Sequence, residues 1–572
     1  MPPRSLIVEK DVEMTTRDGV ILRADIYRPN TSEPVPALLE RIPYGKGFGA
    51  SKLPFALMAA DRGYAVIVQD TRGRWASEGD GAPFIHESQD GYDAVEWAAR
   101  QPWCDGQVGM FGASYTGYTQ LAAAAIRPPS LKAIVPAVTF CNAYDTTFHG
   151  GVPALGTMVS WGLGAQAMHA IVRMPDSLEK LGWLGAWIAA VDGMAQGKTF
   201  GHLPLRDMPL IGREGVQDHV GQVLAHPTYD DYWKALTCAH EALTLPMLHI
   251  GGWYDIFLSS TLSDFAGIAA AGNTRQKLII GPWTHDNFEP VVGEVDFGIQ
   301  SAGMLVLPEE IHLRWFDYWL KGNDNGVMDE PPVRLFVMGE NQWRMENEWP
   351  LARAQNTPYY LHSGGRANTL NGDGVLSPEA PADEAVDTFV YDPRNPVPTR
   401  GGPLCCSGSA LPAGAYDQRE VEARPDVLVY TTPPLDRDVE VTGPLEVHLW
   451  ASTTAPDTDF TAKLVDVEPC GYARNLADGI VRARYRRSVE QADPIQPGEV
   501  YEVVIRLAGT SNLFKAGHRI RVEISSSNFP RFDRNANSGG PLGEDVTLRP
   551  ALQTIWHDAA HPSHIVLPIV PR

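Results

Sequence analysis

Residues 108–125 read VGMFGASYTGYTQLAAAA, an apolar run that leads straight into a serine and then an alanine-rich run. The pattern predicts a buried strand that is followed, with almost no loop, by a helix. A serine at such a turn has a strained backbone that requires small neighbours, and Gly112 supplies one two residues before it. Ser114 is therefore a candidate nucleophile at the end of the strand, where backbone N–H groups of the helix can stabilise an oxyanion.

The turn departs at one position from the usual G-x-S-x-G pattern of a nucleophile elbow. Thr116 stands at the second small position, and Gly117 follows one residue later. A bare Gly-x-Ser is weak evidence, because a structural turn with an incidental serine has the same letters. The strand before it and the helix after it favour the nucleophile interpretation.

Around this segment, short apolar runs alternate with helix-like segments over residues 1–145. Runs rich in Val, Ile and Leu are typical of strands buried on both faces, so we expect an α/β fold with a mainly parallel sheet. Residues 146–240 contain helix-like pieces and no convincing strand run, which predicts an inserted helical cap. The strand pattern resumes over residues 241–351. Short strand runs between Pro/Gly turns then predict an all-β sandwich over residues 352–572.

Length and charge limit the classes of function. The chain has 572 residues with 47 Lys and Arg against 69 Asp and Glu, a net charge of −22. Such a surface repels phosphate backbones and anionic lipids, so we expect neither nucleic acid nor a membrane as partner. The six cysteines are too sparse for a disulfide framework and have no zinc-site spacing, so no metal or cofactor is expected. Without a signal-peptide core or membrane span, the chain is expected in the cytoplasm, and a homodimer is left open.

A serine needs a base and an orienting carboxylate to attack a carbonyl group at neutral pH. In α/β-hydrolase order both follow the nucleophile on loops after later strands, the acid first. Two strand ends remain after the insertion: LPMLHIGGWYD ends at Asp255, and QKLIIGPWTHD carries His285. We therefore expect His285 to take the Ser114 proton and Asp255 to orient the imidazole. Asp264 and Asp286 are rival acids, the first within the next helix and the second adjacent to the base.

An oxyanion hole needs two hydrogen-bond donors. The backbone N–H of Tyr115, directly after the nucleophile, is one by the geometry of the elbow. The second usually comes from the loop after an early strand, which here reads RIPYGKG (41–47) and has no Gly-Gly run. Tyr44 in this loop can donate its phenol instead, and the alternative is a packing tyrosine beside Pro43.

Five ordered motifs and two C-terminal segments of this sequence resemble the cocaine esterase family, part of the wider X-Pro dipeptidyl-peptidase and α-amino acid ester hydrolase superfamily. The resemblance covers essentially the whole chain. The motifs are PYGK (43–46), QDTRGRWASEG (69–79), GASYTG (112–117), GGWYDIF (251–257) and GPWTH (281–285), and the segments are DTDFTAKLVDV (457–467) and AGHRIRVEISSSNFPRFDRN (516–535).

The resemblance implies an α/β-hydrolase core with an inserted helical cap and a C-terminal jelly-roll β-sandwich. It implies Ser114, Asp255 and His285 as the triad, and the Tyr44 hydroxyl with the Tyr115 amide as the oxyanion hole. The elbow form G-x-S-Y-x-G is the family's own, so Thr116 fits it.

The resemblance also implies a small-molecule ester as substrate, with an acyl group held among aromatic side chains. Candidates for this pocket are Trp161 on a cap helix, Phe257 just after the acid, and Leu404 with Cys405 from the third domain. We expect an ester with a bulky acyl group, an aromatic one included. The lining around Leu404 and Cys405 differs from that implied for cocaine, so cocaine itself is not the expected substrate.

Other functions stay open at this point. The same triad serves an amidase, an acylase or an X-Pro peptidase, because fold and triad do not fix specificity. X-Pro peptidases of this superfamily are longer chains with an extra N-terminal domain. Amino ester hydrolases need carboxylates that bind the ammonium group of the substrate. Glu309 and Glu310 are candidates for that role, although a pair at a helix start is more often helix-stabilising. A non-enzymatic carbohydrate-binding protein is the remaining alternative, and it rests on residues 352–572 alone.

Overall fold

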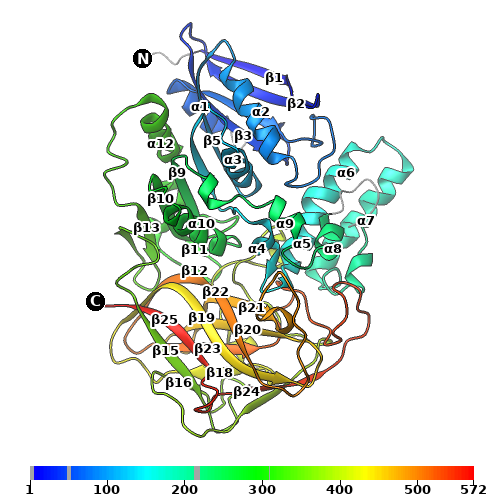
Figure 1. The fold of residues 1–572 in the computed structure, drawn as a ribbon, viewed down its shortest axis with the longest axis vertical. Helices are drawn as coiled ribbons and strands as arrows, with labels where there is room; N and C mark the ends of the chain where they lie inside the picture. Colours follow the sequence, from blue (N-terminus) through cyan, green and yellow to red (C-terminus); the bar gives the residue numbers. More distant parts are fainter. Residues whose placement is uncertain (1–4, 48–52, 211–218, 308) are drawn as a thin grey trace.

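The computed structural model describes residues 5–47, 53–210, 219–307 and 309–572. Figure 1 shows three parts: a sheet flanked by helices, a group of helices beside it, and a β-sandwich packed beneath both. This architecture confirms the predicted α/β core with an added all-β domain. Among the helices of the described ranges, none combines the length and the apolarity needed to cross a bilayer.

The first sheet is mainly parallel. Its strand order is β1-β2-β4-β3-β5-β6-β9-β10-β13-β14, and every pair from β4 to β13 is parallel, whereas β1, β2 and β14 pair antiparallel at the edges. Its strands are β1 (Leu6–Thr15), β2 (Ile21–Pro29), β3 (Val35–Ile42), β4 (Ala65–Asp70), β5 (Cys104–Ala113), β6 (Leu131–Ala137), β9 (Met247–Tyr254), β10 (Gln276–Thr284), β13 (Val333–Val337) and β14 (Gln342–Glu346).

Helices cover both faces of this sheet, because its central strands are apolar on both sides. Ala-rich α2 and α3 pack on one face, and α1 with the aromatic side of α12 packs on the other. Because β5, β9 and β10 run in the same direction, their carboxyl ends meet at one edge of the sheet. The helices are α1 (Leu53–Asp61), α2 (Glu87–Ala99), α3 (Tyr115–Ala125), α10 (Leu258–Ala270), α11 (Gly303–Val306) and α12 (Glu309–Lys321), with small elements β11 (Val291–Val292), β12 (Val295–Asp296) and η5 (Ile299–Ser301).

The segment between β6 and β9 is helical, as expected, but it also contains a short hairpin. This hairpin pairs Phe148 with Pro153 and is too short for a sequence pattern to show it. The segment contains α4 (Ala143–Thr147), β7 (Phe148–His149), β8 (Val152–Pro153), α5 (Leu155–Trp161), the π-helical η2 (Gly162–Ala167), α6 (Met168–Arg173), α7 (Leu178–Ala195), η3 (Leu205–Asp207), α8 (His219–Ala225), α9 (Asp231–Ala235) and η4 (His240–Ala242).

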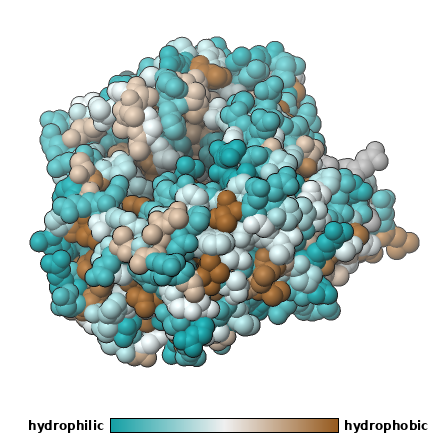
Figure 2. All heavy atoms as spheres, turned by 60° about the horizontal axis from the view of Figure 1, so that its bottom comes forward, coloured by the Kyte–Doolittle hydropathy of each residue, from teal (hydrophilic) through white to brown (hydrophobic). Residues whose placement is uncertain are grey.

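The C-terminal part is a sandwich of mostly antiparallel strands around an apolar core that includes residues of β9 and β13 from the first sheet. Figure 2 shows this end of the molecule, with a largely hydrophilic surface and separate apolar patches. The domain boundaries expected above stay predictions. The elements are β15 (Gln355–His362), β16 (Val375–Ser377), β17 (Asp387–Tyr391), η6 (Gly408–Ala410), α13 (Arg419–Glu422), β18 (Leu428–Thr431), β19 (Val439–Thr453), β20 (Asp459–Val467), β21 (Ala473–Arg482), η7 (Ala483–Tyr485), β22 (Tyr501–Phe514), β23 (Arg519–Ser525), β24 (Ala551–Trp556) and β25 (His564–Val570).

Candidate active site

Ser114 lies in the turn between β5 and α3 with a strained backbone, φ 63° and ψ −125°. Its N–H donates to the carbonyl of Ala137 over 2.9 Å, and its carbonyl accepts from the hydroxyl of Thr139 over 2.8 Å. These bonds to β6 and the segment after it hold the serine in a conformation that a non-glycine residue rarely adopts. The serine hydroxyl is thereby presented at the sheet edge where the parallel strands end.

The two small residues of the elbow are explained by close packing. A Cβ on Gly112 would lie 2.2 Å from Oγ1 of Thr116, and a Cβ on Gly117 would lie 2.5 Å from Cβ of Thr139. Thr116 itself is accommodated because its hydroxyl donates to the carbonyl of Ala113 over 2.9 Å. After the serine, the position that must be small is therefore 117 and not 116, which accounts for the departure from the G-x-S-x-G pattern.

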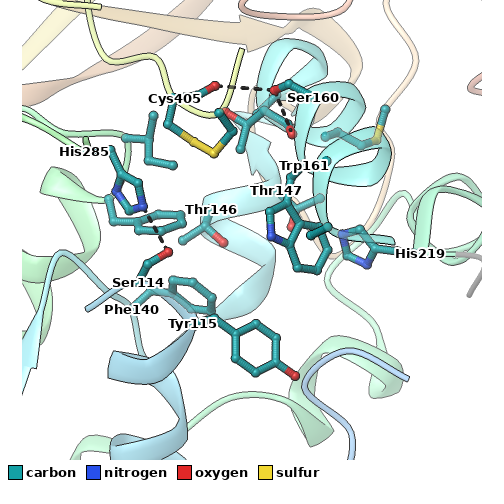
Figure 3. A pocket seen from close by; sticks show the side chains of 18 of the residues that line it. Ser114, Tyr115, Phe140, Thr146, Thr147, Ser160, Trp161, His219, His285 and Cys405 are labelled. Atoms are coloured by element: carbon teal, nitrogen blue, oxygen red, sulfur yellow. Dashed lines mark hydrogen bonds between the residues drawn. A yellow bond between two sulfur atoms is a disulfide. The ribbon is translucent and has the colours of Figure 1, made fainter. Parts of the chain in front are cut away.

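The structure brings Ser114, Asp255 and His285 together at this edge, and Figure 3 shows His285 directed at Ser114. Nε2 of His285 lies 2.9 Å from Oγ of Ser114, and Nδ1 lies 2.7 Å from Oδ1 of Asp255. The Asp255 side chain is fully buried, and its other oxygen accepts the N–H of Phe257 over 3.1 Å. The imidazole is thus placed to accept the serine proton, with the carboxylate fixing the opposite ring nitrogen.

The charges around His285 oppose the effect of burial on its pKa. Burial lowers the pKa of the imidazole, but the hydrogen bond and charge of Asp255, with the charge of Asp286, raise the pKa above its ordinary value overall. The protonated form is therefore stabilised by the two carboxylates. This is the form that the base adopts when it has taken the serine proton.

The rival acids lie elsewhere. Asp264 accepts the N–H of Cys141 over 2.8 Å and lies 2.9 Å from Nε2 of His240. Asp286 is exposed and accepts the N–H of Cys406 over 3.2 Å. Of the three candidate carboxylates, only that of Asp255 is within hydrogen-bonding distance of the His285 imidazole.

Tyr44 reaches the same point from the loop after β3. Its phenol oxygen accepts the indole N–H of Trp161 over 3.1 Å, and Ser114 is close enough to lower the pKa of the phenol. Burial raises the pKa of the phenol, more than Trp161, Arg74 and Ser114 lower it, so the hydroxyl is protonated at neutral pH. Because the indole already donates to the phenol oxygen, the phenol proton is available to an oxygen atom near Ser114.

Tyr115 differs from Tyr44 in the direction of its phenol. That hydroxyl donates to Glu87 over 2.8 Å and accepts the N–H of Phe84 over 3.0 Å. The phenol therefore holds the loop of Phe84 against α2 and α3. The backbone N–H at the start of α3 is the part of Tyr115 that can serve an oxyanion.

A cavity of about 360 Å³ opens over Ser114 and His285 and is mostly apolar. Trp161, labelled in Figure 3, and Phe257 line it; the Trp161 ring comes from the cap, and the Phe257 ring comes from the residue before α10. Leu404 does not line it: its side chain is 2% exposed and packs in a core shared by the cap and the α/β sheet, whereas the next two residues face the cavity. The lining residues are Tyr44, Phe84, Ser114, Tyr115, Phe140, Thr146, Thr147, Ala154, Thr157, Met158, Ser160, Trp161, Gly164, Ala165, His219, Ile256, Phe257, His285, Asp286, Cys405 and Cys406.

Sequence reasoning missed three aromatic residues of this lining: Phe84, Phe140 and His219. Phe84 stacks on Tyr115 with ring centroids 4.7 Å apart, and Phe140 meets Phe257 edge to face at 4.8 Å. Phe84 and Phe140 lie on irregular segments and His219 begins the short helix α8, so no sequence pattern marks them as lining. The result is a nearly continuous aromatic wall.

The cavity carries little charge. Burial lowers the pKa of His219 to about 4, so this imidazole is neutral at neutral pH. Asp286 at the exposed rim is the only carboxylate among the described lining residues. Glu310 is exposed on α12 and is not part of this lining, and the side chain of Glu309 lies outside the described residues.

Among the described residues, two groups of three ligand-type side chains come close enough to share a metal ion. In the group of Cys141, His240 and Asp264, burial raises the pKa of the Cys141 thiol well above its ordinary value, which disfavours the thiolate that a metal requires. In the group of Asp286, Cys405 and Cys406, the two sulfur atoms are joined in a disulfide. Neither group offers free thiolates as it stands.

Comparison with known proteins agrees with this geometry. The X-Pro dipeptidyl-peptidase (S15 family) model matches residues 18–287, and that of the X-Pro dipeptidyl-peptidase C-terminal non-catalytic domain matches residues 325–566. Cocaine esterase from Rhodococcus sp. strain MB1 Bresler is 40% identical over 580 residues, with 99% of both chains covered.

Two solved structures share the whole architecture. An aminopeptidase from a marine sediment Thaumarchaeota archaeon superposes with a TM-score of 0.81 at 26% identity, covering 100% of this chain and 97% of that one. An α-amino acid ester hydrolase gives a TM-score of 0.79 at 25% identity, covering 99% and 97%.

Proposed function

This chain belongs to the X-Pro dipeptidyl-peptidase (S15) family, and on that basis we propose that it hydrolyses small-molecule carboxylic esters with a bulky, apolar acyl group. It is a serine ester hydrolase, as its similarity to cocaine esterase and α-amino acid ester hydrolase indicates. The assignment of roles to single residues and the choice of acyl group are the proposal. The observation that carries it is the 2.9 Å approach of His285 to Ser114 at the floor of an aromatic cavity.

The mechanism follows from the contacts. Ser114 Oγ attacks the ester carbonyl carbon while His285 accepts its proton, and Asp255 stabilises the imidazolium. The negative oxygen of the tetrahedral intermediate is bound by the Tyr44 hydroxyl and the Tyr115 N–H.

Collapse of this intermediate breaks the bond to the alcohol oxygen, which leaves with the proton from His285. Water then attacks the acyl-enzyme by the same route, with His285 as base, and releases the carboxylic acid and Ser114.

The acyl preference is inferred from the walls of the cavity. Aromatic rings at the site stabilise a large apolar group by burying its surface, at about 25 cal/mol per Å². An acetyl group leaves most of a 360 Å³ cavity unfilled. We therefore expect benzoyl-type esters to react with a higher kcat/KM than acetyl esters of the same alcohol.

Substrates with a free ammonium group are the less favoured alternative. Amino esters and X-Pro peptides carry a positive charge that needs a carboxylate partner, and Asp286 at the rim is the single carboxylate of the described lining. Because the chain is similar in structure to an aminopeptidase, the substrate panel below includes such substrates. Three expectations from the sequence stay predictions: that nucleic acid is not a partner, that the protein is cytoplasmic, and that it can form a homodimer.

The test is a panel of p-nitrophenyl benzoate, p-nitrophenyl acetate, an X-Pro anilide and an amino acid ester on the full chain and on Ser114→Ala. We expect the benzoate to be cleaved best by the wild type, no cleavage by the variant, and a serine-directed phosphonate to add mass at Ser114. Hydrolysis that survives in Ser114→Ala would reject the triad. A preference for the amino ester or the anilide would reject the acyl assignment.

A further inference from the structure

A disulfide joins the consecutive residues Cys405 and Cys406, on the loop between β17 and η6, and both residues line the substrate cavity. The remaining cysteines are free thiols: Cys104, Cys141 and Cys238 are buried, and Cys470 is exposed. The Cys405 side chain is buried, whereas Cys406 is exposed and has a backbone φ of 69°. Cys406 is therefore the member of the pair that solvent reaches, at the rim of the active site.

The backbone of this pair lies against two other parts of the site. The carbonyl of Cys405 lies 3.4 Å from the hydroxyl of Ser160 in cap helix α5, which donates to the carbonyl of Gly156 at the shorter distance of 2.5 Å. The N–H of Cys406 donates to Asp286 over 3.2 Å, next to the proposed base. Figure 3 shows the disulfide on the same side of the cavity as His285, with Ser160 beyond it. The pair thus forms the sandwich's part of the cavity wall, held between the cap and the loop of the base.

We propose that the Cys405–Cys406 pair is a redox-modification site whose state sets the acyl selectivity of the cavity. This inference rests on the ester hydrolase function proposed above. The reaction is thiol–disulfide exchange with a dithiol reductant: a thiolate of the reductant attacks the exposed sulfur of Cys406, the S–S bond breaks, and Cys405 leaves as a thiolate. The second thiol of the reductant resolves the mixed disulfide. Two electrons and two protons pass to the protein, and the reductant becomes a disulfide.

Reduction changes the shape of the wall. Two bonded sulfur atoms are about 2 Å apart, whereas two non-bonded atoms of this size require roughly 3.5–4 Å. Because Cys405 is buried and its neighbour Leu404 is packed in the core, the Cys406 side chain is the one that must move. The movement replaces a closed apolar surface with two thiols that can donate hydrogen bonds.

The consequence depends on the size of the acyl group. A large acyl group that fills the cavity touches this wall, whereas an acetyl group near Ser114 does not extend to it. Selectivity differences of about 10- to 200-fold arise from changes of one methylene in a pocket. We expect reduction to change the ratio of kcat/KM for p-nitrophenyl benzoate over p-nitrophenyl acetate by about tenfold, with the acetate rate nearly unchanged.

The experiment compares the full chain before and after treatment with a phosphine, which reduces the disulfide as it is oxidised to the phosphine oxide with uptake of one water. Thiol titration of the native protein counts the thiols formed, and both esters are assayed in each state. We expect two additional thiols, a changed ratio, and recovery of both starting values on reoxidation. The double variant Cys405→Ser/Cys406→Ser is expected to have the ratio of the reduced enzyme and no response to phosphine, and Cys470→Ser, exposed and outside the cavity lining, to respond as wild type.

An unchanged ratio after two new thiols appear would overturn the selectivity claim, and no new thiols on treatment would overturn the redox site. Both failures leave hydrolysis by Ser114 intact. Equal hydrolysis by wild type and Ser114→Ala marks failure of the proposed function instead, and the thiol count still decides the redox site in that case.

Discussion

The indole Nε1 of Trp161 in the cap donates a 3.1 Å hydrogen bond to the phenol oxygen of Tyr44 in the α/β core. These residues are 117 positions apart in the chain. The bond leaves the phenol proton as the free donor at Ser114, so a cap residue orients the proposed oxyanion donor. The cap therefore does more than cover the cavity, because it supports the chemistry at the serine.

Tyr44→Phe is expected to lower kcat by about 10²–10³ with little change in KM, since the lost donor acts on the developing oxyanion. Trp161→Phe keeps an aromatic ring and loses only the indole N–H, so its loss of kcat is expected to be smaller. Steady-state kinetics on an aryl ester, with melting temperatures to verify folding, measures both. A larger loss in Trp161→Phe than in Tyr44→Phe would contradict the assigned order of roles.

Tyr115→Phe is expected to act on stability rather than on chemistry. The variant keeps the backbone N–H but removes the phenol from Oε1 of Glu87 and from the Phe84 N–H, while the other Glu87 oxygen keeps its ion pair with Arg41; we expect a destabilisation of about 1–3 kcal/mol. Denaturant unfolding should show this loss, and kcat should fall far less than in Tyr44→Phe. A drop in kcat as deep as that of Tyr44→Phe in folded protein would show that the phenol itself acts in the reaction.

The pH profile should show one acid limb due to His285. The imidazole must be neutral to accept the serine proton, and Asp255 and Asp286 raise its pKa, so kcat/KM is lost as pH falls through an inflection above 6.5. Asp286→Asn removes one of the raising charges and is expected to shift the inflection to lower pH by up to about one unit. Asp176→Asn, an exposed acid outside the cavity lining, is the matched control and should leave the profile where it is. If the inflection stays in place in Asp286→Asn, the charge of Asp286 does not raise the pKa of His285.

Gly112→Ala is expected to destroy the elbow. The new Cβ would lie 2.2 Å from the Thr116 hydroxyl, and the φ of +134° disfavours any side chain. We expect a destabilisation above about 2 kcal/mol and loss of activity. Gly182→Ala in α7, where a Cβ meets no atom within 4 Å, should instead stabilise by up to about 1 kcal/mol. Thermal unfolding and an aryl ester assay on both variants provide the check.

The local parts of the site are predictable from the sequence because each follows a regular element. Strand β5, Gly112 and helix α3 specify the turn at Ser114 through short-range sterics. Asp255 and His285 follow strands β9 and β10, in the acid-then-base order of α/β hydrolases. The alternation of strand and helix patterns likewise predicts the layers, since periodicity reports which faces of an element are buried.

Apart from Trp161 and Phe257, the cavity wall was decided by tertiary structure. Phe84 and Phe140 lie on irregular segments, and Leu404 turns into the core while the next two cysteines turn into the cavity. The disulfide partner of Cys405 is its own neighbour, and the carbonyl of Cys405 lies 3.4 Å from the hydroxyl of Ser160, 245 residues away in the chain. Irregular loops have no periodic pattern, so the direction of each side chain depends on contacts with distant segments, and these exist only when core, cap and sandwich are packed together.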